Sequence, residues 1–541
     1  MKVMKMKSLL PLLISDSYKQ GHHRLYPKNI EYVASNMTGR STRVEGQEFV
    51  VVFGIRYFVK KYLIDAWEEF FNTPIEDVLK EYHRVIDNHL GPNVISDENV
   101  RYLHSLGYLP IKMKSLPEGT KCPIGVPICT FINTDPKCAW LTNFLETISQ
   151  TILWKPMTSA TTAYRYRQLL DEYADETSDC PEFVTWQGHD FSMRGTDSLE
   201  GCQTSGMAHL LSFTGTDTIP AIIAAEEYYG ADIEKELIGC SVTASEHSIQ
   251  CSYFDETSED EHAYIQAMLD AQPEGIVSIV SDGYDYWKMI TETFPSFKDK
   301  ILARKGKVVV RPDTGDPVKI VTGYFVKDTD YTSGYIKHLV KTATGRFEFG
   351  LYCFNDGNDA IKTKDGIYMD EECNILTEAE VRGTIAILAE HFGAVKNSKG
   401  YYELNPAIGC IYGDSITFER ASKICERLML KGYASTNIVF GIGSYTYQYV
   451  TRDTYGFAFK ATWVQVGGKE KAIFKDPKTG DGKKKSAKGL LKVYLDKKGN
   501  IVYKDNCTKA EEETGLLMPV FVDGKEYNIP SFKEIRERLL T

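Results

Sequence analysis

The sequence "KVVVRPDTGDP" at residues 307–317 joins the clearest strand signal of this chain to a polar loop. Its first half is β-branched and apolar without alternation, which is typical of a parallel strand buried on both faces. Its second half contains one arginine and two aspartates, and such groups are costly to bury without a partner. We therefore predict a strand whose end opens onto solvent, an ion pair or a ligand.

A similar succession of short apolar run, polar or glycine turn and amphipathic segment recurs from about residue 183 onward. The runs are "FVTWQ", "HLLSF", "IGCSVTA", "GIVSIVS", "KVVVRP", "AIGCIYG", "NIVFGIG" and "FAFKATWVQV". Segment 414–432 shows helical spacing of apolar residues between a cap-type start and a glycine stop. About eight such units predict an α/β fold with a closed or nearly closed barrel, whose reactive groups lie on the loops after the strands.

The remaining segments are less regular. We expect an N-terminal α+β layer over residues 1–180, a barrel-like catalytic domain over 181–465, and a C-terminal segment over 466–541 that packs on the N-terminal layer. The tyrosine-rich stretch at about 322–400 lacks a strong βα pattern and is interpreted as an insertion. The lysine-rich stretch near residue 480 has the composition of a solvated loop.

Composition limits the function classes. The 541 residues carry a net charge of -11, which argues against a general nucleic-acid or anionic-membrane surface. The twelve cysteines form no CxxC pair, as expected of reduced thiols in a cytoplasmic protein without structural zinc. The N-terminus imitates a signal peptide, but its apolar stretch is short and contains Pro11. No uninterrupted apolar run is long enough to span a bilayer.

The predicted strand ends share a chemistry. After "KVVV", Arg311 could hold a phosphate or an aromatic group, Asp313 could accept from a sugar hydroxyl, and Gly315 would admit close approach. A salt-bridged rim is the alternative. Related loops contain Gly413, Asp414, Gly441, Gly443, Ser444, Asp282 and Asp285. Glycine beside a helix amino end exposes backbone N–H groups that can bind phosphate.

Cations and an aromatic residue extend this pattern. The cations Arg452, Lys460, Lys475 and Lys484 stand out in an acidic chain and suit a sugar with phosphates at two ends, balanced by Mg²⁺. Phosphoribosyl pyrophosphate is such a molecule. Upstream, Phe191, Arg194 and Asp217 would suit a flat heteroaromatic ring with a hydrogen-bond donor, although Phe191 could equally be a core residue.

Ordered motifs along nearly the whole chain resemble one family. They are "DSYKQGH", "SNMTGRS", "DFSMRG", "FTGTDT", "ASEHS", "VSDGYD", "RPDTGDP", "GDSI", "TRDTYGFAFK" and "FKDP". They are similar to the type II phosphoribosyltransferases, and within them to the members that act on nicotinamide. The resemblance implies a barrel-like domain joined to an α+β domain, and a homodimer with active sites at its interface. It implies transfer of the 5-phosphoribosyl group from phosphoribosyl pyrophosphate to nicotinamide, giving nicotinamide mononucleotide and pyrophosphate in NAD salvage.

The resemblance also assigns roles to residues. Phe191 and Tyr18 of the partner subunit would sandwich the nicotinamide ring, with Arg311 beside it and Asp217 accepting from the carboxamide nitrogen. Asp313, Gly413 and Asp414 correspond to ribose-binding positions, and the backbone near Gly443 and Ser444 to the 5'-phosphate site. The cations that match pyrophosphate or ATP contacts, several of them across the interface, are Arg40, Arg452, Lys460, Lys475 and Lys484. Two positions depart from the family pattern: Ser444, followed by Tyr445, and Ala458.

The resemblance answers what the single histidine of "ASEHS" does. His247 matches the family's phosphorylated histidine, with Asp282 and Glu246 placed to orient and polarise the imidazole. ATP is then a co-substrate that phosphorylates His247, and hydrolysis of that phosphate would favour substrate binding and product formation. A carboxylate-oriented imidazole is also what nucleophilic catalysis requires.

Two other functions remain open at this point. Nicotinate phosphoribosyltransferase would share the fold and the sugar donor, but the Asp217 carboxylate accepts from an amide and repels the carboxylate of nicotinate. A catalytically silent scaffold could keep the fold, since fold alone does not determine function. The intact set His247, Asp313, Arg311 and Asp217 argues against the scaffold.

Overall fold

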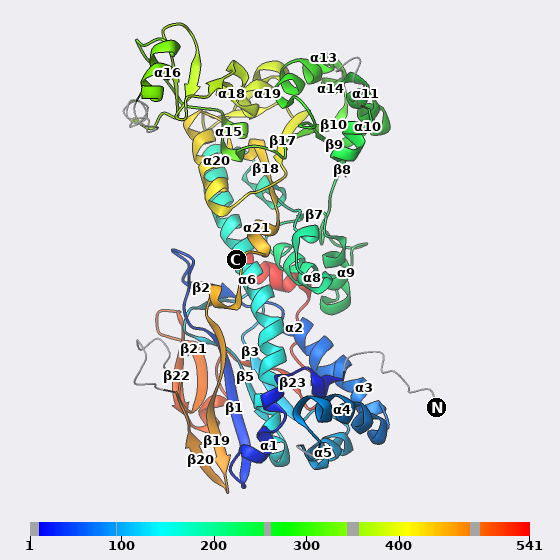
Figure 1. Cartoon of the computed structure of the whole chain (residues 1–541). Helices are drawn as coiled ribbons and strands as arrows, with labels where there is room; N and C mark the ends of the chain where they lie inside the picture. The colour runs from blue at the N-terminus through cyan, green and yellow to red at the C-terminus, as the bar shows by residue number, and fades with distance from the viewer. Residues whose placement is uncertain (1–9, 93–94, 254–260, 343–355, 476–486) are drawn as a thin grey trace.

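A computed structural model describes residues 10–92, 95–253, 261–342, 356–475 and 487–541. It has two lobes joined by a helix of 39 residues, α6 (Ala139–Thr177). The lower lobe in Figure 1 is built on an antiparallel sheet, and the upper lobe is built on a parallel sheet. None of the helices in the described ranges is long and apolar enough to cross a membrane.

The antiparallel sheet of seven strands brings together both ends of the chain. Its order is β20-β19-β1-β5-β3-β23-β24. The strands are β1 (Ile30–Gly39), β3 (Ile111–Ser115), β5 (Pro127–Asn133), β19 (Phe457–Val466), β20 (Lys469–Ala472), β23 (Met518–Val522) and β24 (Lys525–Glu526). Helix α6 packs on β1, β5 and β19. The hairpin of β21 (Leu490–Leu495) and β22 (Ile501–Cys507) adds a small apolar cluster of Leu490 and Cys507 with Ala34 and Trp463 of the sheet.

The run "FAFKATWVQV" corrects one prediction. We expected it in the barrel, but it forms β19 and pairs antiparallel with β1, with Asn36 opposite Lys460. An apolar run predicts that a strand is buried. The strand with which it pairs depends on contacts with residues far away in sequence.

The parallel sheet of the upper lobe is strongly curved. Its order is β7-β6-β18-β17-β10-β9-β8. The strands are β6 (Gly188–Asp190), β7 (Gly215–Thr216), β8 (Thr243–Ala244), β9 (Glu274–Val280), β10 (Lys305–Arg311), β17 (Ile408–Tyr412) and β18 (Ile438–Ile442). Just before β8, the backbone of Cys240 exchanges hydrogen bonds with Thr214 and Thr216 at the opposite edge. The sheet is thus nearly closed, as the predicted α/β barrel requires.

Two of the runs predicted as barrel strands do not form strands. "FVTWQ" is a helical turn ending in α7 (Val184–Gln187), and "HLLSF" begins on the last residue of helix α8 (Leu199–His209). The strands β6 and β7 follow these runs and are only two or three residues long. Short apolar runs do not distinguish helix from strand, and strands this short leave no periodic pattern.

The insertion is a small separate unit on the upper lobe. It contains α16 (Ser333–Thr342) and a sheet of β11 (Val326–Asp328), β12 (Ala360–Lys362), β13 (Tyr368–Asp370) and β14 (Ile375–Leu376). The chain leaves the barrel at Gly323 and returns at Gly383, where the two glycine backbones pack against each other. The following helix α19 (Thr384–Phe392) already belongs to the barrel, because Ile385 and Leu388 are part of its core.

Candidate functional site

The loops after the parallel strands meet at one end of the barrel. A Cβ atom on Gly441 of β18 would lie 2.7 Å from the ring of Phe191, which follows β6. A Cβ atom on Gly413, after β17, would collide with the Asp313 carboxylate. The structure therefore brings these predicted residues together, and both glycines make room for groups from neighbouring strands.

Arg311 and Asp313 form a loose pair at this end. Arg311 Nε lies 3.6 Å from Asp313 Oδ1, and the guanidinium also donates to the Ser245 carbonyl oxygen at 2.7 Å. Burial raises the pKa of Asp313, although nearby Arg311 opposes the shift. Neither Arg311 Nε nor Asp313 Oδ1 has a hydrogen-bond partner within the described ranges. Two charged, buried atoms without close partners favour a ligand site over a sealed salt-bridged rim.

His247 begins helix α10 (His247–Ser252) beside this pair. Its Nε2 lies 3.0 Å from Oδ1 of Asp282, a carboxylate only 2% exposed. Asp282 Oδ2 accepts from the backbone N–H of Asp313 at 2.9 Å and from the Thr314 hydroxyl at 2.7 Å. Burial alone would raise the pKa of Asp282, but these hydrogen bonds outweigh it and lower the pKa.

The Asp282 contact decides the imidazole tautomer. A carboxylate accepts hydrogen bonds, so Nε2 carries the proton and Nδ1 keeps a lone pair. The His247 side chain is 44% exposed, so a ligand can reach it. Glu246, which we expected to help orient the imidazole, instead accepts a hydrogen bond from the Ser248 hydroxyl.

Asp217 lies at the mouth of a cavity of about 480 Å³ that passes into the barrel. The lining includes Phe191, His189 and Asp217 at the strand ends and Lys307, Phe183 and Trp186 towards the strand starts. Asp217 Oδ1 accepts from the Ser241 hydroxyl and lies 2.9 Å from His189 Nε2. Burial would raise the pKa of Asp217, but the His189 and Ser241 hydrogen bonds lower it. Asp217 Oδ2 has no hydrogen-bond partner in the part of the chain that the structure describes.

His189 and Ser241 are site residues that our sequence analysis missed. His189 lies in β6 and Phe191 directly follows this strand, and the two-residue spacing in extended chain predicts that both side chains lie on one face. Their rings lie 4.7 Å apart between centroids. Ser241 precedes the two-residue strand β8, and the sequence contains no pattern that directs its hydroxyl to Asp217.

The predicted phosphate loop follows β18. Ser444 opens the short helix α21 (Ser444–Tyr447), and Gly443 precedes it. The turn Met193–Gly195, which contains Arg194, packs against it: a Cβ atom on Gly195 would lie 2.5 Å from the Ser444 Cβ atom. The loop therefore adjoins the segment that carries Phe191.

A second group of predicted residues gathers on the antiparallel sheet. Burial lowers the pKa of Lys460, nearby Arg40, Lys475 and Arg452 lower it further, and Glu146 opposes them. Glu146 also contributes, after burial and Asp16, to the raised pKa of Tyr18, which is 64% exposed. Tyr18 and Lys460 thus lie near Glu146, which also pairs with Lys19 at 3.2 Å, and the other predicted cations lie near Lys460. Lys460 belongs to β19 of the lower lobe, whereas the parallel strands and their ends lie in the upper lobe (Figure 1). Lys484 lies outside the described residues.

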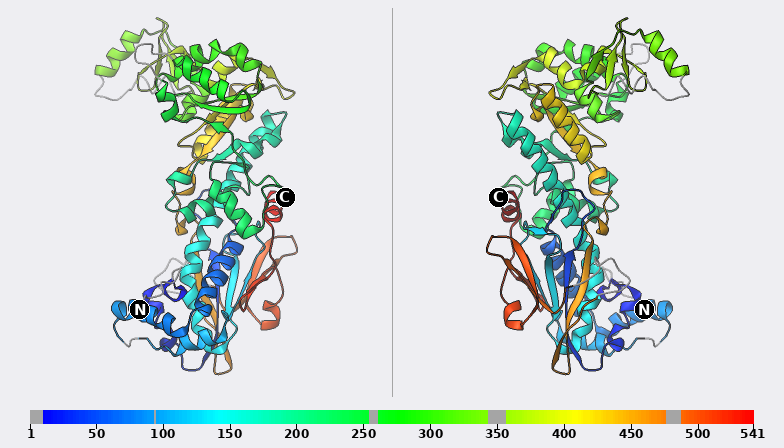
Figure 2. Two further views of the ribbon diagram at one scale, coloured as in Figure 1. Left: turned by 90° about the vertical axis from the view of Figure 1, so that its right-hand side faces the viewer. Right: turned by 90° about the vertical axis from the view of Figure 1, so that its left-hand side faces the viewer.

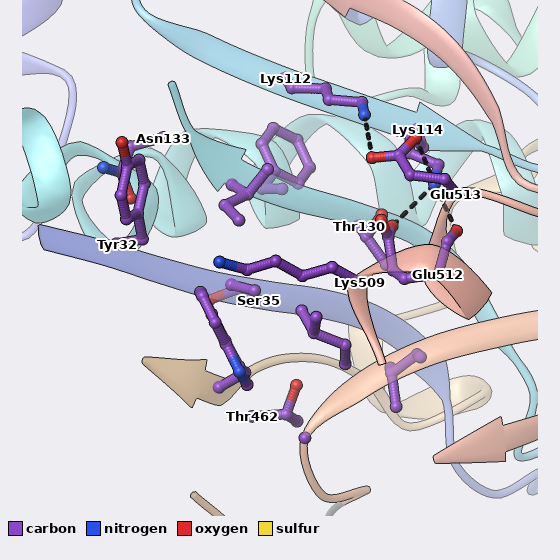
Figure 3. Close-up of a pocket in the computed structure, with 17 residues that line it drawn as sticks. Tyr32, Ser35, Lys112, Lys114, Thr130, Asn133, Thr462, Lys509, Glu512 and Glu513 are labelled. Atoms are coloured by element: carbon purple, nitrogen blue, oxygen red, sulfur yellow. Dashed lines mark hydrogen bonds and ion pairs between the residues drawn. The ribbon is translucent and has the colours of Figure 1, made fainter. Parts of the chain in front are cut away.

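A separate cavity of about 240 Å³ lies between the antiparallel sheet and the C-terminal segment (Figure 3). All three of its lysines are already paired, and Lys509 lies 3.1 Å from Glu470. The other two pair with the C-terminal segment: Lys114 with Glu512 at 2.7 Å and Lys112 with Glu513 at 2.6 Å. These pairs fasten the C-terminal segment to β3. The cavity lies on the lower lobe, and none of the strand-end residues of the barrel lines it.

Comparisons with known proteins agree with this arrangement. A model of the nicotinate phosphoribosyltransferase family matches residues 186–514, and a model of the nicotinamide phosphoribosyltransferase N-terminal domain matches residues 11–113. The chain is 40% identical to a nicotinamide phosphoribosyltransferase of Acinetobacter baylyi, over 98% of this chain and 97% of that protein. It is 30% identical to one of Mycoplasma pneumoniae, over 89% of this chain and 97% of that protein.

Solved structures share the fold at low sequence identity. The nicotinate-nucleotide pyrophosphorylase of Pyrococcus furiosus matches with a TM-score of 0.51 and 14% identity, over 97% of this chain and 93% of that chain. Human nicotinic acid phosphoribosyltransferase matches with a TM-score of 0.50 and 13% identity, over 98% and 93%. The predicted type II phosphoribosyltransferase fold is confirmed.

Proposed function

The chain belongs to the nicotinamide phosphoribosyltransferase family, and from this membership we propose that it transfers the 5-phosphoribosyl group of phosphoribosyl pyrophosphate to nicotinamide, releasing pyrophosphate, in NAD salvage. One observation carries the proposal for the site. The pocket at Phe191 and Asp217 opens beside the charged loop of Arg311 and Asp313. An aromatic base and a phosphorylated sugar would therefore meet where the strand ends converge. The acidic chain and the free thiols of its described cysteines suit a cytoplasmic enzyme.

Asp217 selects nicotinamide over nicotinate in this proposal. Its Oδ1 is occupied by His189 and Ser241, which leaves Oδ2 to accept from the carboxamide N–H of nicotinamide. Nicotinate would bring a second carboxylate to the same place, and two like charges in a partly buried pocket are costly. Phe191 supplies an aromatic face for the pyridine ring.

The sugar donor would lie along Asp313, Gly413 and Asp414, with its 5'-phosphate at the backbone near Gly443 and Ser444. The pyridine nitrogen already has a lone pair, so the protein needs to orient the ring and the sugar rather than remove a proton. Cationic groups stabilise the charge of the departing pyrophosphate. The reaction therefore needs no general base.

The residues at this place suit Mg²⁺. Asp313 Oδ1 is buried and unsatisfied, and Asp414 lies near enough to raise the pKa of Asp313. Mg²⁺ is often held by one or two carboxylates together with substrate phosphates. Asp313 and Asp414 would hold the ion, which supplies positive charge to the phosphates.

ATP would phosphorylate His247 in this proposal. The lone pair on Nδ1 attacks the γ-phosphorus, the bond to the β–γ bridging oxygen breaks, and ADP leaves. Asp282 keeps the proton on Nε2 and stabilises the positive charge that the ring gains. Water later cleaves the N–P bond and releases inorganic phosphate. Stimulation of phosphoribosyl transfer is the proposed consequence.

A homodimer would complete the site. Arg40 follows β1 and Lys460 lies in β19 of the antiparallel sheet, whereas Phe191 follows β6 of the parallel sheet and His247 begins α10. The two sheets belong to different lobes (Figure 2). A two-fold dimer can place the lower lobe of one chain against the upper lobe of the other, and it then forms two equivalent sites. Tyr18, exposed in the single chain, would then cover the nicotinamide ring.

Release of pyrophosphate from phosphoribosyl pyrophosphate with Mg²⁺ tests the reaction. Nicotinamide should support release, nicotinate should support it poorly, and ATP should accelerate it. Activity with nicotinate alone would refute the role of Asp217 but leave the fold and the sugar donor intact. Absence of release with either base would favour a scaffold that has kept the fold.

A further inference from the structure

A completely buried histidine connects the two ends of the proposed site. His209 is the last residue of α8 and has no exposed surface. Its Nε2 lies 3.0 Å from the carbonyl oxygen of Gly215 in β7, two residues before Asp217. Its Nδ1 lies 2.7 Å from the hydroxyl of Tyr447, the last residue of α21.

Both hydrogen bonds have a defined direction. A carbonyl oxygen only accepts, so Nε2 carries the proton and donates it to Gly215. Nδ1 must then accept, and the Tyr447 hydroxyl donates to it. Burial lowers the pKa of His209 to about 4, so the ring stays neutral and keeps this tautomer at neutral pH. The imidazole is therefore a permanent bridge and not a proton carrier.

The His209 imidazole is held rigidly by neighbouring rings, and the two elements that it joins, β7 and α21, are short. The imidazole stacks on Phe213 with ring centroids 5.1 Å apart and meets the Tyr447 ring edge-on at 5.9 Å. By contrast, β7 has two residues at the edge of the sheet, and α21 has four residues. β7 is also held by β6 and Cys240, and α21 by α6, but the His209 imidazole hydrogen-bonds to both elements and so fixes the distance between Gly215 and Tyr447.

We propose that His209 is a positioning residue that holds the base pocket and the phosphate loop at a fixed spacing, so that filling the phosphate loop strengthens binding of the aromatic base. This inference rests on the proposed function, because it places phosphate at Ser444 and nicotinamide at Asp217. A phosphate bound at the loop shifts α21 or restricts its motion. Because Tyr447 and His209 are hydrogen-bonded in series to Gly215, the position or motion of Gly215 changes with it. Asp217, two residues further on, then presents its carboxylate in the productive position.

The test measures coupling between two ligands that do not react. The dissociation constant of nicotinamide is determined by calorimetry with and without saturating ribose 5-phosphate. In the unmodified protein we expect ribose 5-phosphate to lower the dissociation constant of nicotinamide roughly fivefold or more, a common size for coupling between sites. In Tyr447→Phe, which loses only the hydroxyl, we expect the ratio to fall below about twofold.

Tyr166→Phe is the matched control. The Tyr166 hydroxyl is also buried and lies 3.0 Å from the hydroxyl of Thr446 in the same helix α21, but it is not on the path through His209. A loss of packing or stability alone would affect both variants, whereas the proposed bridge predicts that only Tyr447→Phe loses the coupling.

A second measurement remains decisive if Tyr447→Phe does not fold. Ribose 5-phosphate should slow amide hydrogen exchange at residues 214–218 of the unmodified protein. Unchanged exchange there would overturn the proposal, and so would independent binding of the two ligands or an unchanged ratio in Tyr447→Phe. If the protein binds neither ligand, the proposed function fails and this inference fails with it. If both bind independently, only the inference fails.

Discussion

His247 and Asp282 form a hydrogen-bonded pair with Nε2 and Oδ1 3.0 Å apart, and the same carboxylate accepts the backbone N–H of Asp313. One buried side chain therefore positions both the proposed phosphate acceptor and the proposed sugar-binding loop. Loss of its charge should affect the ATP-dependent step more than the shape of the loop.

Asp282→Asn should lower the stimulation by ATP. The asparagine oxygen can still accept from Asp313 and Thr314, but its amide group would face His247 and favour the wrong tautomer. Loss of one charge-assisted hydrogen bond is worth about 2 kcal/mol, or roughly thirtyfold in rate. ATP hydrolysis and phosphohistidine formation are the measurements. Asp285→Asn is the control, because Asp285 caps α12 (Tyr286–Lys288) through a bond to Lys288 N that asparagine can keep. Equal ATP hydrolysis in both variants would contradict the role of Asp282.

Asp217→Ser should weaken the use of nicotinamide as a substrate and reduce the preference of the enzyme for nicotinamide over nicotinate. The serine removes the carboxylate that accepts from the carboxamide, so kcat/KM for nicotinamide should fall roughly thirtyfold, or about 2 kcal/mol. The same change removes the negative charge that repels nicotinate, so kcat/KM for nicotinate should stay level or rise. Steady-state assays with both bases measure the two effects in one variant. Unchanged constants for both would exclude Asp217 from base selection.

Mixing two inactive variants tests whether two chains build one site. Asp313→Ala damages the strand-end group, and Lys460→Ala damages the cation group on the lower lobe. If each site uses the two groups from different chains, a mixed dimer contains one intact site. An equal mixture should then regain about a quarter of the normal activity, because half of the dimers are mixed and each has one good site. Tagged subunits verify the exchange. Mixed dimers without recovered activity would place both groups in the site of a single chain.

Glu118 should make stability depend on pH. The carboxylate is 3% exposed and accepts from the backbone N–H groups of Ile55 and Arg56 and from the Tyr229 hydroxyl. Burial raises its pKa to about 7. Between about pH 4.5 and pH 7 the folded protein binds more protons here than the unfolded chain, so its free energy of unfolding falls as pH rises.

Glu118→Gln removes this titration. The unmodified protein should lose unfolding free energy between about pH 4.5 and pH 8, and the variant should not lose this contribution. The stability of the variant relative to the unmodified protein should therefore rise by up to about 3 kcal/mol over this range. Urea unfolding at both pH values measures the shift. A pH-independent difference would show that Glu118 has an ordinary pKa.

Gly383→Ala should damage the neck of the insertion. Gly383 has φ +80° and lies so close to Thr322 and Gly323 that an added Cβ atom would collide with their backbone. We expect a loss of about 3 kcal/mol from strain and collision together. Gly366→Ala is the matched control, with φ +82° and open space around the added atom, and should cost only about 1 kcal/mol. Thermal unfolding distinguishes them. Equal losses would mean that the close contact at the neck is not required.

The sequence alone was sufficient for the barrel class and for the convergence of the strand-end residues. Buried parallel strands need uninterrupted apolar runs, and their carboxyl ends meet at one edge, so Asp313 and Gly413 could be placed together from local patterns. Asp217 was predicted with Phe191 from the chemistry of the strand ends, and the resemblance to the family supplied the predicted role of His247.

Only the tertiary structure decided which distant groups meet. The strand β19 has the composition of a barrel strand, yet it pairs with β1 in the other sheet because pairing depends on long-range contacts. His189 and Ser241 share Asp217 Oδ1, and His209 joins Gly215 to Tyr447, through side chains separated by up to 238 residues. The division of the predicted residues between two lobes also has no local signal. Periodicity reports which face of an element is buried, whereas the folded chain determines what lies against that face.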